Sequence, residues 1–159
     1  MYEVFIDRIK TNEDKERLLE EIEVLLTGIY EDKGYALDSL LQTGVRSWVS
    51  SYIREEFSKS GVNRESFLRG LEKELRGLKD VYLTIAFEPT QDQIDTMASF
   101  LKQEIGSSII LNLSYDPQII GGVQIIYEGL FRDFSFNRIF EKEFEEDREE
   151  ILKKLAQNE

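Results

Sequence analysis

The sequence predicts an α+β fold, in which a helical N-terminal domain over residues 1–78 precedes a β-α-β-β-α domain over residues 79–159. Two observations support this prediction. Apolar residues recur every three or four positions as far as Leu78, which is typical of helices. From Val81 onward they alternate with other residues, which is typical of strands. The sequence has no Gly- or Ser-rich linker between the two patterns, so the domain boundary depends on the change of period alone.

Three helices are predicted in the N-terminal domain. The first begins at Thr11-Asn12, because these side chains can accept hydrogen bonds from the free backbone N–H groups of a first turn. Residues 32–34 interrupt the periodic pattern, and a second helix extends from residue 37 to 57. Gly61 ends that helix, and Asn63 is expected to cap the third.

The second predicted helix carries an apolar stripe that is broad enough to face two neighbours at once. Packing inside the domain is the commoner fate of such a stripe. A domain of only about three helices can leave part of it for a partner, and the hypothesis is then a groove that holds a partner helix. The candidate groove residues are Leu41, Val45, Trp48, Val49 and Tyr52.

The C-terminal domain is predicted to open with a strand over residues 81–87, which Pro89 closes. Thr90 and Gln93 have the spacing of a capping box, in which two side chains reciprocally satisfy backbone donors at the start of a helix. That helix is expected to end at Gly106, because glycine is common just after the last turn of a helix.

Three more strands complete the predicted sheet. Residues 108–115 and 123–127 are β-branched and apolar, and Glu128-Gly129 is expected to turn the chain into a short return strand over residues 130–132. A closing helix is predicted from Ser135. Its outer face is rich in glutamate, at Glu141, Glu143, Glu145, Glu146, Glu149 and Glu150.

The charge balance excludes several classes of partner. The chain has 32 acidic and 20 basic residues, a formal net charge of -12. A nucleic-acid-binding surface must neutralise phosphates with a basic face, so nucleic acid is not an expected partner. The same charge is repelled by anionic lipid, so any membrane association is expected to be indirect, through another protein.

The residue types also limit the possible chemistry. The chain has no Cys and no His, which excludes disulfides, thiolate or imidazole metal ligands, and Ser-His or Cys-His catalytic pairs. No segment approaches the roughly 20 apolar residues of a membrane span. We therefore expect a cytoplasmic protein without a cofactor.

The loop at Asp116-Pro117-Gln118-Ile119-Ile120-Gly121-Gly122 is the most distinctive segment. Asp before Pro is typical of a turn start, Ile119 and Ile120 are expected to pack beneath the turn, and two glycines allow positive φ. The alternatives are a phosphate loop or a carboxylate site formed with Asp133. No P-loop or dinucleotide motif surrounds the glycines, and 32 acidic residues create carboxylate pairs by chance, so a turn is the better interpretation.

Three short patterns, in order, resemble the ATP synthase delta family, whose mitochondrial relative is the oligomycin-sensitivity-conferring protein. The first follows the opening strand, the second is the glycine-glycine loop, and the third opens the last helix. The matching positions are Ala86, Pro89, Thr90 and Gln93, then Asp116, Pro117, Ile120, Gly121 and Gly122, then Asp133 and Ser135. The order and spacing of the three patterns are far more specific than any one of them.

The resemblance implies a mechanical function in an F-type ATP synthase. It implies a stator subunit that is not an enzyme, peripheral on the cytoplasmic face of the membrane, which supports ATP synthesis coupled to hydrogen ion or other ion transport. The expected partners are the alpha subunit, held by the N-terminal domain, and the b-subunit stalk helices, held by the C-terminal domain. The N-terminal domain is shorter than the six-helix bundle of the family.

Two alternatives stay open. The E subunit of vacuolar and archaeal rotary ATPases also has a glycine-glycine hairpin near its C-terminus, but it begins with a long, highly charged helix, against which the breaks at Gly34 and Gly61 argue. From another class, the abundant carboxylates permit a small metal-dependent hydrolase, in which Asp116 would be the residue to test.

Overall fold

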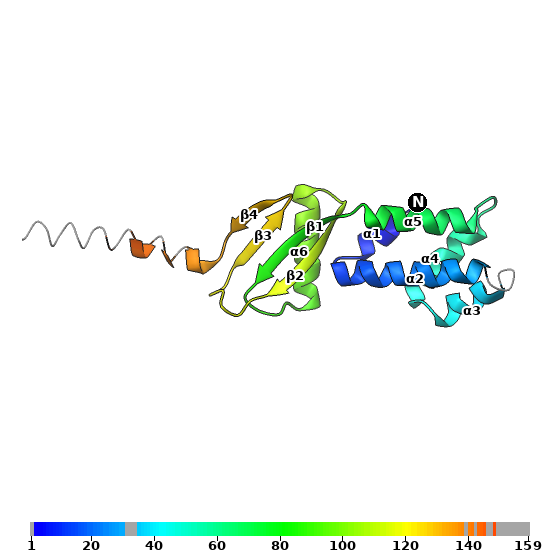
Figure 1. Cartoon of the computed structure of the whole chain (residues 1–159), viewed down its shortest axis with the longest axis horizontal. Helices are drawn as coiled ribbons and strands as arrows, with labels where there is room; N and C mark the ends of the chain where they lie inside the picture. Colours follow the sequence, from blue (N-terminus) through cyan, green and yellow to red (C-terminus); the bar gives the residue numbers. More distant parts are fainter. Residues whose placement is uncertain (1, 31–34, 139, 142, 146–147, 149–159) are drawn as a thin grey trace, which may run out of the picture. The chain divides into compact units, whose positions relative to one another are not determined.

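The computed structural model describes residues 2–30, 35–138, 140–141, 143–145 and 148 (Figure 1). Helices dominate the first half of the chain and a sheet dominates the second, so the predicted α+β class is confirmed. The elements run in the order α1 (Glu3–Arg8), α2 (Asn12–Tyr30), α3 (Tyr35–Thr43), α4 (Ser47–Ser58), α5 (Arg64–Arg76), β1 (Lys79–Ile85), α6 (Gln91–Ile105), β2 (Ile109–Tyr115), β3 (Val123–Tyr127) and β4 (Leu130–Asp133).

The second predicted helix is in fact two helices, α3 and α4, so that part of the sequence prediction is wrong. The last turn of α3 closes with a hydrogen bond from the Gly44 N–H to the Leu40 carbonyl. Arg46 then adopts an extended backbone (φ -59°, ψ 144°), and its N–H donates to the Glu21 carboxylate on α2. The Arg46 N–H, which would have continued the helix, is thus satisfied by a side chain on α2. The helix therefore ends and the chain turns.

Grouped by contacts, the described residues form two compact units. The helical unit contains the described residues within Met1–Lys79 and Met97–Ile110, and the sheet unit contains those within Asp80–Thr96 and Leu111–Glu159. This grouping by contacts does not test which parts of the chain fold independently. The domain boundary predicted between residues 78 and 79 therefore stays a prediction. None of the described helices combines the length and the apolar character needed to cross a membrane.

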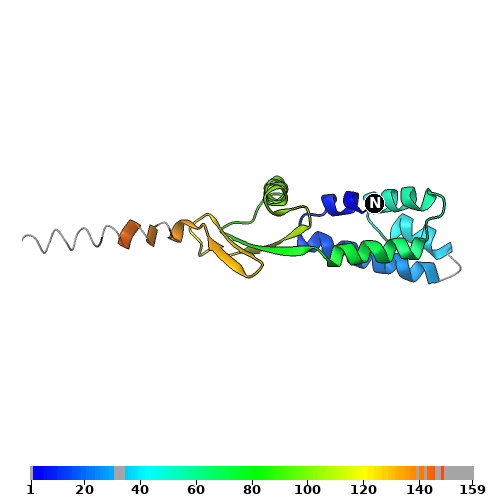
Figure 2. The same ribbon diagram turned by 90° about the horizontal axis from the view of Figure 1, so that it is seen from above.

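The core of the helical unit is built from the expected apolar stripes. Helices α2 and α5 lie side by side in both views (Figures 1 and 2) and bury Leu18, Ile22, Leu25, Leu68, Leu71 and Leu75 completely. The short helix α1, which was not predicted, contributes Phe5, whose ring is 1% exposed and lies about 6 Å from the rings of Trp48 and Tyr52. Such a short helix is not stable alone, so its position depends on this aromatic cluster.

Lys102 on α6 fixes the C-terminal end of α1. Its Nζ donates to the carbonyl of Ile6 at 2.9 Å and to that of Ile9 at 3.3 Å. A cation favours the carbonyl-rich end of a helix. Burial lowers the pKa of Lys102 below its ordinary value, repulsion from Lys10 lowers it further, and Asp7 opposes this shift.

Replacing Lys102 with Met should change how stability depends on pH. Because the pKa of Lys102 is lower in the folded than in the unfolded protein, the unfolded state binds more protons between the two values. The free energy of unfolding of the unmodified protein should therefore gain a component that rises with pH towards the ordinary lysine pKa of 10.5. Urea unfolding from neutral pH to about pH 10 should show a smaller rise in the variant. Equal rises would contradict the prediction.

The four strands of the sheet lie in the order β2-β1-β3-β4. Strands β1 and β3 are antiparallel, from Val81↔Tyr127 to Ile85↔Val123. At the other side of β1, Lys79 bonds to Ser108 and Ile85 bonds to Asp116, so β1 and β2 run in the same direction, with α6 between them in the chain. This parallel pairing needs a crossover connection, and α6 is that connection.

The hairpin from β3 to β4 forms as predicted. Glu128 (φ 48°) and Gly129 (φ 79°) both have positive φ, and Tyr127 pairs with Leu130. Two consecutive positive φ angles are typical of the tight turn whose twist matches the flanking strands. After the sheet, residues 136–138, 140–141, 143–145 and 148 are helical. The other residues of the predicted closing helix lie outside the described residues.

Candidate functional site

The Asp116–Gly122 loop begins as an Asp-initiated turn. The Asp116 carboxylate accepts from the Gln118 N–H at 2.9 Å, and its carbonyl accepts from the Ile119 N–H. Ile119 is buried, as expected, but Ile120 is 64% exposed, so its predicted packing beneath the turn is wrong. The Ile120 N–H donates to the side chain of Asn137 at 2.9 Å.

The two glycines bring the loop against the start of the last helix. Gly121 and Gly122 have φ of 96° and 84°. A Cβ placed on Gly122 would lie 2.3 Å from the carbonyl oxygen of Phe134 and 2.7 Å from the Cα of Ser135. The Phe136 N–H donates to the Gly121 carbonyl at 3.1 Å. Glycine is therefore required at Gly122 for both conformation and space.

The Asp133–Ser135 pattern forms a second turn at the same place. Asp133 accepts from the Ser135 N–H at 2.8 Å and from the Gln124 side chain at 3.1 Å. The structure thus brings the second and third sequence patterns together, and their polar groups bond locally. This arrangement supports a structural role for Asp116 and Asp133. Within the described parts of the chain, no three acidic side chains are placed to hold a metal ion.

The first pattern caps α6 as predicted. The Thr90 N–H donates to the Gln93 side chain at 2.9 Å, and the Gln93 N–H donates back to the Thr90 hydroxyl at 3.4 Å. Ala86 and Pro89 lie in the connection between β1 and this cap, where the Ile85 carbonyl accepts from the Asp116 N–H. All three patterns thus make local hydrogen bonds within the sheet unit, and their structural role stays a prediction.

The predicted groove residues of the helical unit are largely internal. Leu41 and Val49 are 2% and 0% exposed, so a partner could not reach them without opening the bundle. Val45, Trp48 and Tyr52 are half-buried against the core. The Trp48 ring is also flanked by the guanidinium groups of Arg8 and Arg46, at 5.3 and 5.1 Å. A partner contact at the three half-buried residues stays a prediction.

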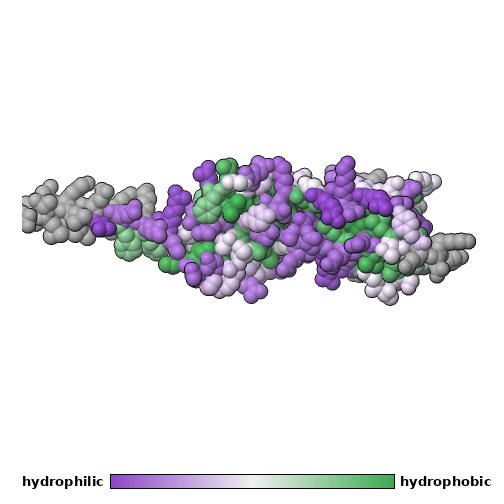
Figure 3. Space-filling view, viewed as in Figure 1, coloured by the Kyte–Doolittle hydropathy of each residue, from purple (hydrophilic) through white to green (hydrophobic). Residues whose placement is uncertain are grey.

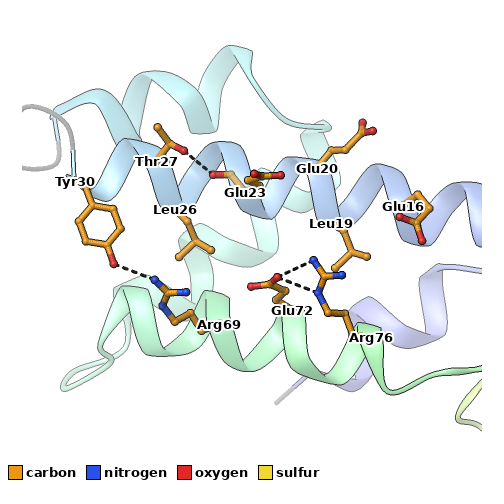
Figure 4. Close-up of a pocket in the computed structure, with 10 residues that line it drawn as sticks. All are labelled: Glu16, Leu19, Glu20, Glu23, Leu26, Thr27, Tyr30, Arg69, Glu72 and Arg76. Carbon is orange, nitrogen blue, oxygen red and sulfur yellow. Dashed lines mark hydrogen bonds and ion pairs between the residues drawn. The ribbon is translucent and has the colours of Figure 1, made fainter.

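A cavity of about 410 Å³ lies instead between α2 and α5 (Figure 4). Leu19 and Leu26 point into it from α2 and form an apolar floor. Its rim is charged and polar, with Glu16, Glu20, Glu23, Thr27 and Tyr30 on α2 and Arg69, Glu72 and Arg76 on α5. Four glutamates against two arginines make the rim acidic. These residues come from two helices that α3 and α4 separate in the chain, so the sequence alone does not show that their faces meet.

The two arginines of the cavity are held by partners on their own helix. Arg76 pairs with Glu72 at 3.0 Å, and Arg69 pairs with Glu65 at 2.9 Å. The Tyr30 hydroxyl donates to Glu65 and accepts from Arg69, which joins the end of α2 to α5. The hydrogen bond from the Tyr30 hydroxyl makes the largest contribution to lowering the pKa of the Glu65 carboxyl, and the hydrogen bond from Arg69 makes the next largest. The glutamates of α2 thus dominate the charge that the rim presents to a partner.

Comparison with known proteins gives one family match and several related proteins. The family model described as ATP synthase delta (OSCP) subunit matches residues 65–146. ATP synthase subunit delta of Desulfatibacillum aliphaticivorans is 28% identical over 128 residues, which cover 76% of this chain and 67% of that protein. The subunit delta of Laribacter hongkongensis is 31% identical over 115 residues, 70% of this chain and 58% of that protein.

A relative of another type also matches. The A-type ATP synthase E subunit of Metallosphaera sedula is 36% identical over 86 residues, which cover 52% of this chain and 42% of that protein. The chain thus spans between 42% and 67% of the lengths of these three relatives.

Proposed function

Because the chain belongs to the ATP synthase delta (OSCP) family, we propose that it is a non-catalytic peripheral-stalk subunit of an F-type ATP synthase. The observation that carries the proposal is the family match itself, which spans residues 65–146 and includes every motif residue named above. In this function the protein is a stator component. It keeps the catalytic head from turning with the rotor, and it performs no bond chemistry.

The proposed partners differ between the two units. The helical unit binds a segment of the alpha subunit, and the sheet unit binds the b-subunit stalk helices. The protein is thereby peripheral on the cytoplasmic face of the membrane, which it reaches only through the complex. Its charge of -12 supports this indirect association, since an anionic surface repels it.

The cavity between α2 and α5 is the proposed alpha-subunit contact. Its apolar floor, Leu19 and Leu26, suits the apolar stripe of an amphipathic helix, and its acidic rim suits a partner with basic flanks. Glu20 and Glu23 are exposed on this rim, so their charges can be changed without disturbing the core.

Co-purification from the cells that make the protein tests the proposal. The tagged full chain should recover both alpha and b subunits. A chain with Glu20→Lys and Glu23→Lys should recover less alpha subunit and an unchanged amount of b subunit, because only the cavity rim is altered. Glu55→Lys, an exposed charge reversal on α4, is the matched control and should recover both normally. Recovery of neither subunit by the unmodified chain would contradict the proposed function.

One observation favours a second candidate, a stator protein of a V/A-type rotary ATPase that resembles its E subunit. It is the 36% identity to the E subunit of Metallosphaera sedula. The structure weighs against it, because the helices described in the N-terminal part are short, and the longest of them, α2, has 19 residues. The same co-purification separates the candidates: V/A-type stator subunits in place of b would support the second.

A further inference from the structure

The outer face of the sheet carries an unusual row of apolar side chains. The strand register places Tyr82 beside Ile126, and Ile126 beside Phe131, on three adjacent strands. These residues are 48%, 43% and 57% exposed. Neighbouring strands lie about 4.8 Å apart, so the row is roughly 10 Å long. Figure 3 shows apolar surface in this part of the chain, amid polar residues.

The opposite face is buried on β1 and half-buried on β3, whereas on β4 Leu130 is 66% exposed. On β1, Val81, Leu83 and Ile85 are at most 5% exposed, as expected for side chains that face a core. In an antiparallel sheet with one covered face, the other face is usually polar. Here the alternate positions hold an aromatic ring, an isoleucine and a second aromatic ring. Adjacent exposed apolar side chains of this kind often mark a surface that a partner covers.

A polar row runs beside the apolar row. The register aligns Thr84 with Gln124 and Gln124 with Asp133. Thr84 shares a hydrogen bond of 2.8 Å with Ser114, and Gln124 donates to Asp133. These side chains bond to one another across the strands. A partner can therefore lie on the apolar row without breaking the polar one.

The charges of this outer face are of one sign. On the described strands β1, β3 and β4, alternation places Asp80 and Asp133 on this face, on either side of the apolar row. The basic residues of these strands, Lys79 and Arg132, occupy the alternate positions. A complementary partner therefore presents an apolar stripe flanked by basic groups.

We propose that the outer face, centred on Tyr82, Ile126 and Phe131, is a docking surface for an amphipathic helix whose apolar stripe is flanked by Lys or Arg. The inference rests on the proposed function, in which that helix belongs to the b-subunit stalk. A helix is about 10–12 Å across with its side chains, which is as wide as the row is long. One helix can therefore contact all three residues. A second copy of this chain does not fit as the occupant, because two acidic faces would then meet.

The test compares affinities of the full chain for the purified soluble stalk domain of the b subunit from the same cells. A chain with Tyr82→Thr and Phe131→Thr should bind at least about tenfold more weakly, since buried aromatic residues dominate helix-docking surfaces. Thr preserves strand propensity. Phe100→Gln is the control: Phe100 is 61% exposed on α6, and its loss should leave the affinity unchanged.

A second measurement applies even if that double variant folds poorly. The chain has no Cys, so Ile126→Cys and Ser99→Cys each introduce a single thiol. Saturating stalk domain should slow maleimide labelling at residue 126 and leave labelling at the exposed residue 99 unchanged. Equal labelling at residue 126 with and without bound stalk would overturn the docking surface but leave the proposed function intact. Failure of the unmodified chain to bind the stalk domain would instead contradict the proposed function.

Discussion

Replacing Glu21 with Ala is expected to lower the free energy of unfolding by about 3 kcal/mol. The Glu21 carboxylate is nearly buried and accepts from the backbone N–H, Nε and Nη2 of Arg46 at distances of 2.9 to 3.1 Å. The variant leaves a guanidinium and a backbone N–H without their acceptor inside the bundle. Removing one partner of a buried ion pair is costly because the other charge stays desolvated. Chemical denaturation followed by circular dichroism measures the loss.

Two controls separate burial from charge. Glu65→Ala removes an equally short ion pair, but the side chains of Arg69 and Glu65 are 57% and 38% exposed, so the loss of stability should be much smaller than for Glu21→Ala. The combined replacement of Glu21 and Arg46 by Leu should be less harmful than Glu21→Ala, since no buried charge is left unpaired and only Asp14, whose side chain is 38% exposed, loses an ion pair. A loss for Glu21→Ala no larger than that for Glu65→Ala would refute the argument.

The second large effect is expected for Gly122→Val, which should destabilise the protein by about 3 kcal/mol or more. Valine is strained at a φ of 84°. Its Cβ would also lie 2.3 Å from the Phe134 carbonyl oxygen, a backbone atom that cannot turn away. Thermal unfolding is the measurement. Stalk binding should fall only as a consequence of unfolding, because we expect the loop to shape the fold and not to contact the stalk.

Gly129→Val separates the two causes. Gly129 has nearly the same φ, 79°, but a Cβ there would have no neighbour within 4 Å. Its cost should be the conformational strain alone, about 1–2 kcal/mol. The difference between the two variants then measures the clash with Phe134 and Ser135. An unchanged melting temperature for Gly122→Val together with lost stalk binding would show that the loop itself contacts the stalk.

Local chemistry explains which predictions from the sequence were confirmed. The Thr90 and Gln93 capping box involves residues three positions apart, and the Glu128-Gly129 turn needs only two residues that tolerate positive φ. Short-range patterns of this kind depend little on the rest of the chain. The short helix α1 was missed because its six residues gain stability from Phe5 in the aromatic cluster, which no local pattern reveals.

The sequence by itself determined the α+β class, the helix caps, the hairpin turn and the ordered patterns that mark the family, because each depends on residues close together in the chain. Only the tertiary structure decided where the chain breaks at Arg46, since the acceptor Glu21 lies 25 positions away. It also decided that the faces of α2 and α5 enclose a cavity. Alternation alone shows that Tyr82 and Thr84 share a face. Only the strand register puts Ile126 and Phe131 beside Tyr82, and only the folded structure leaves the three side chains exposed.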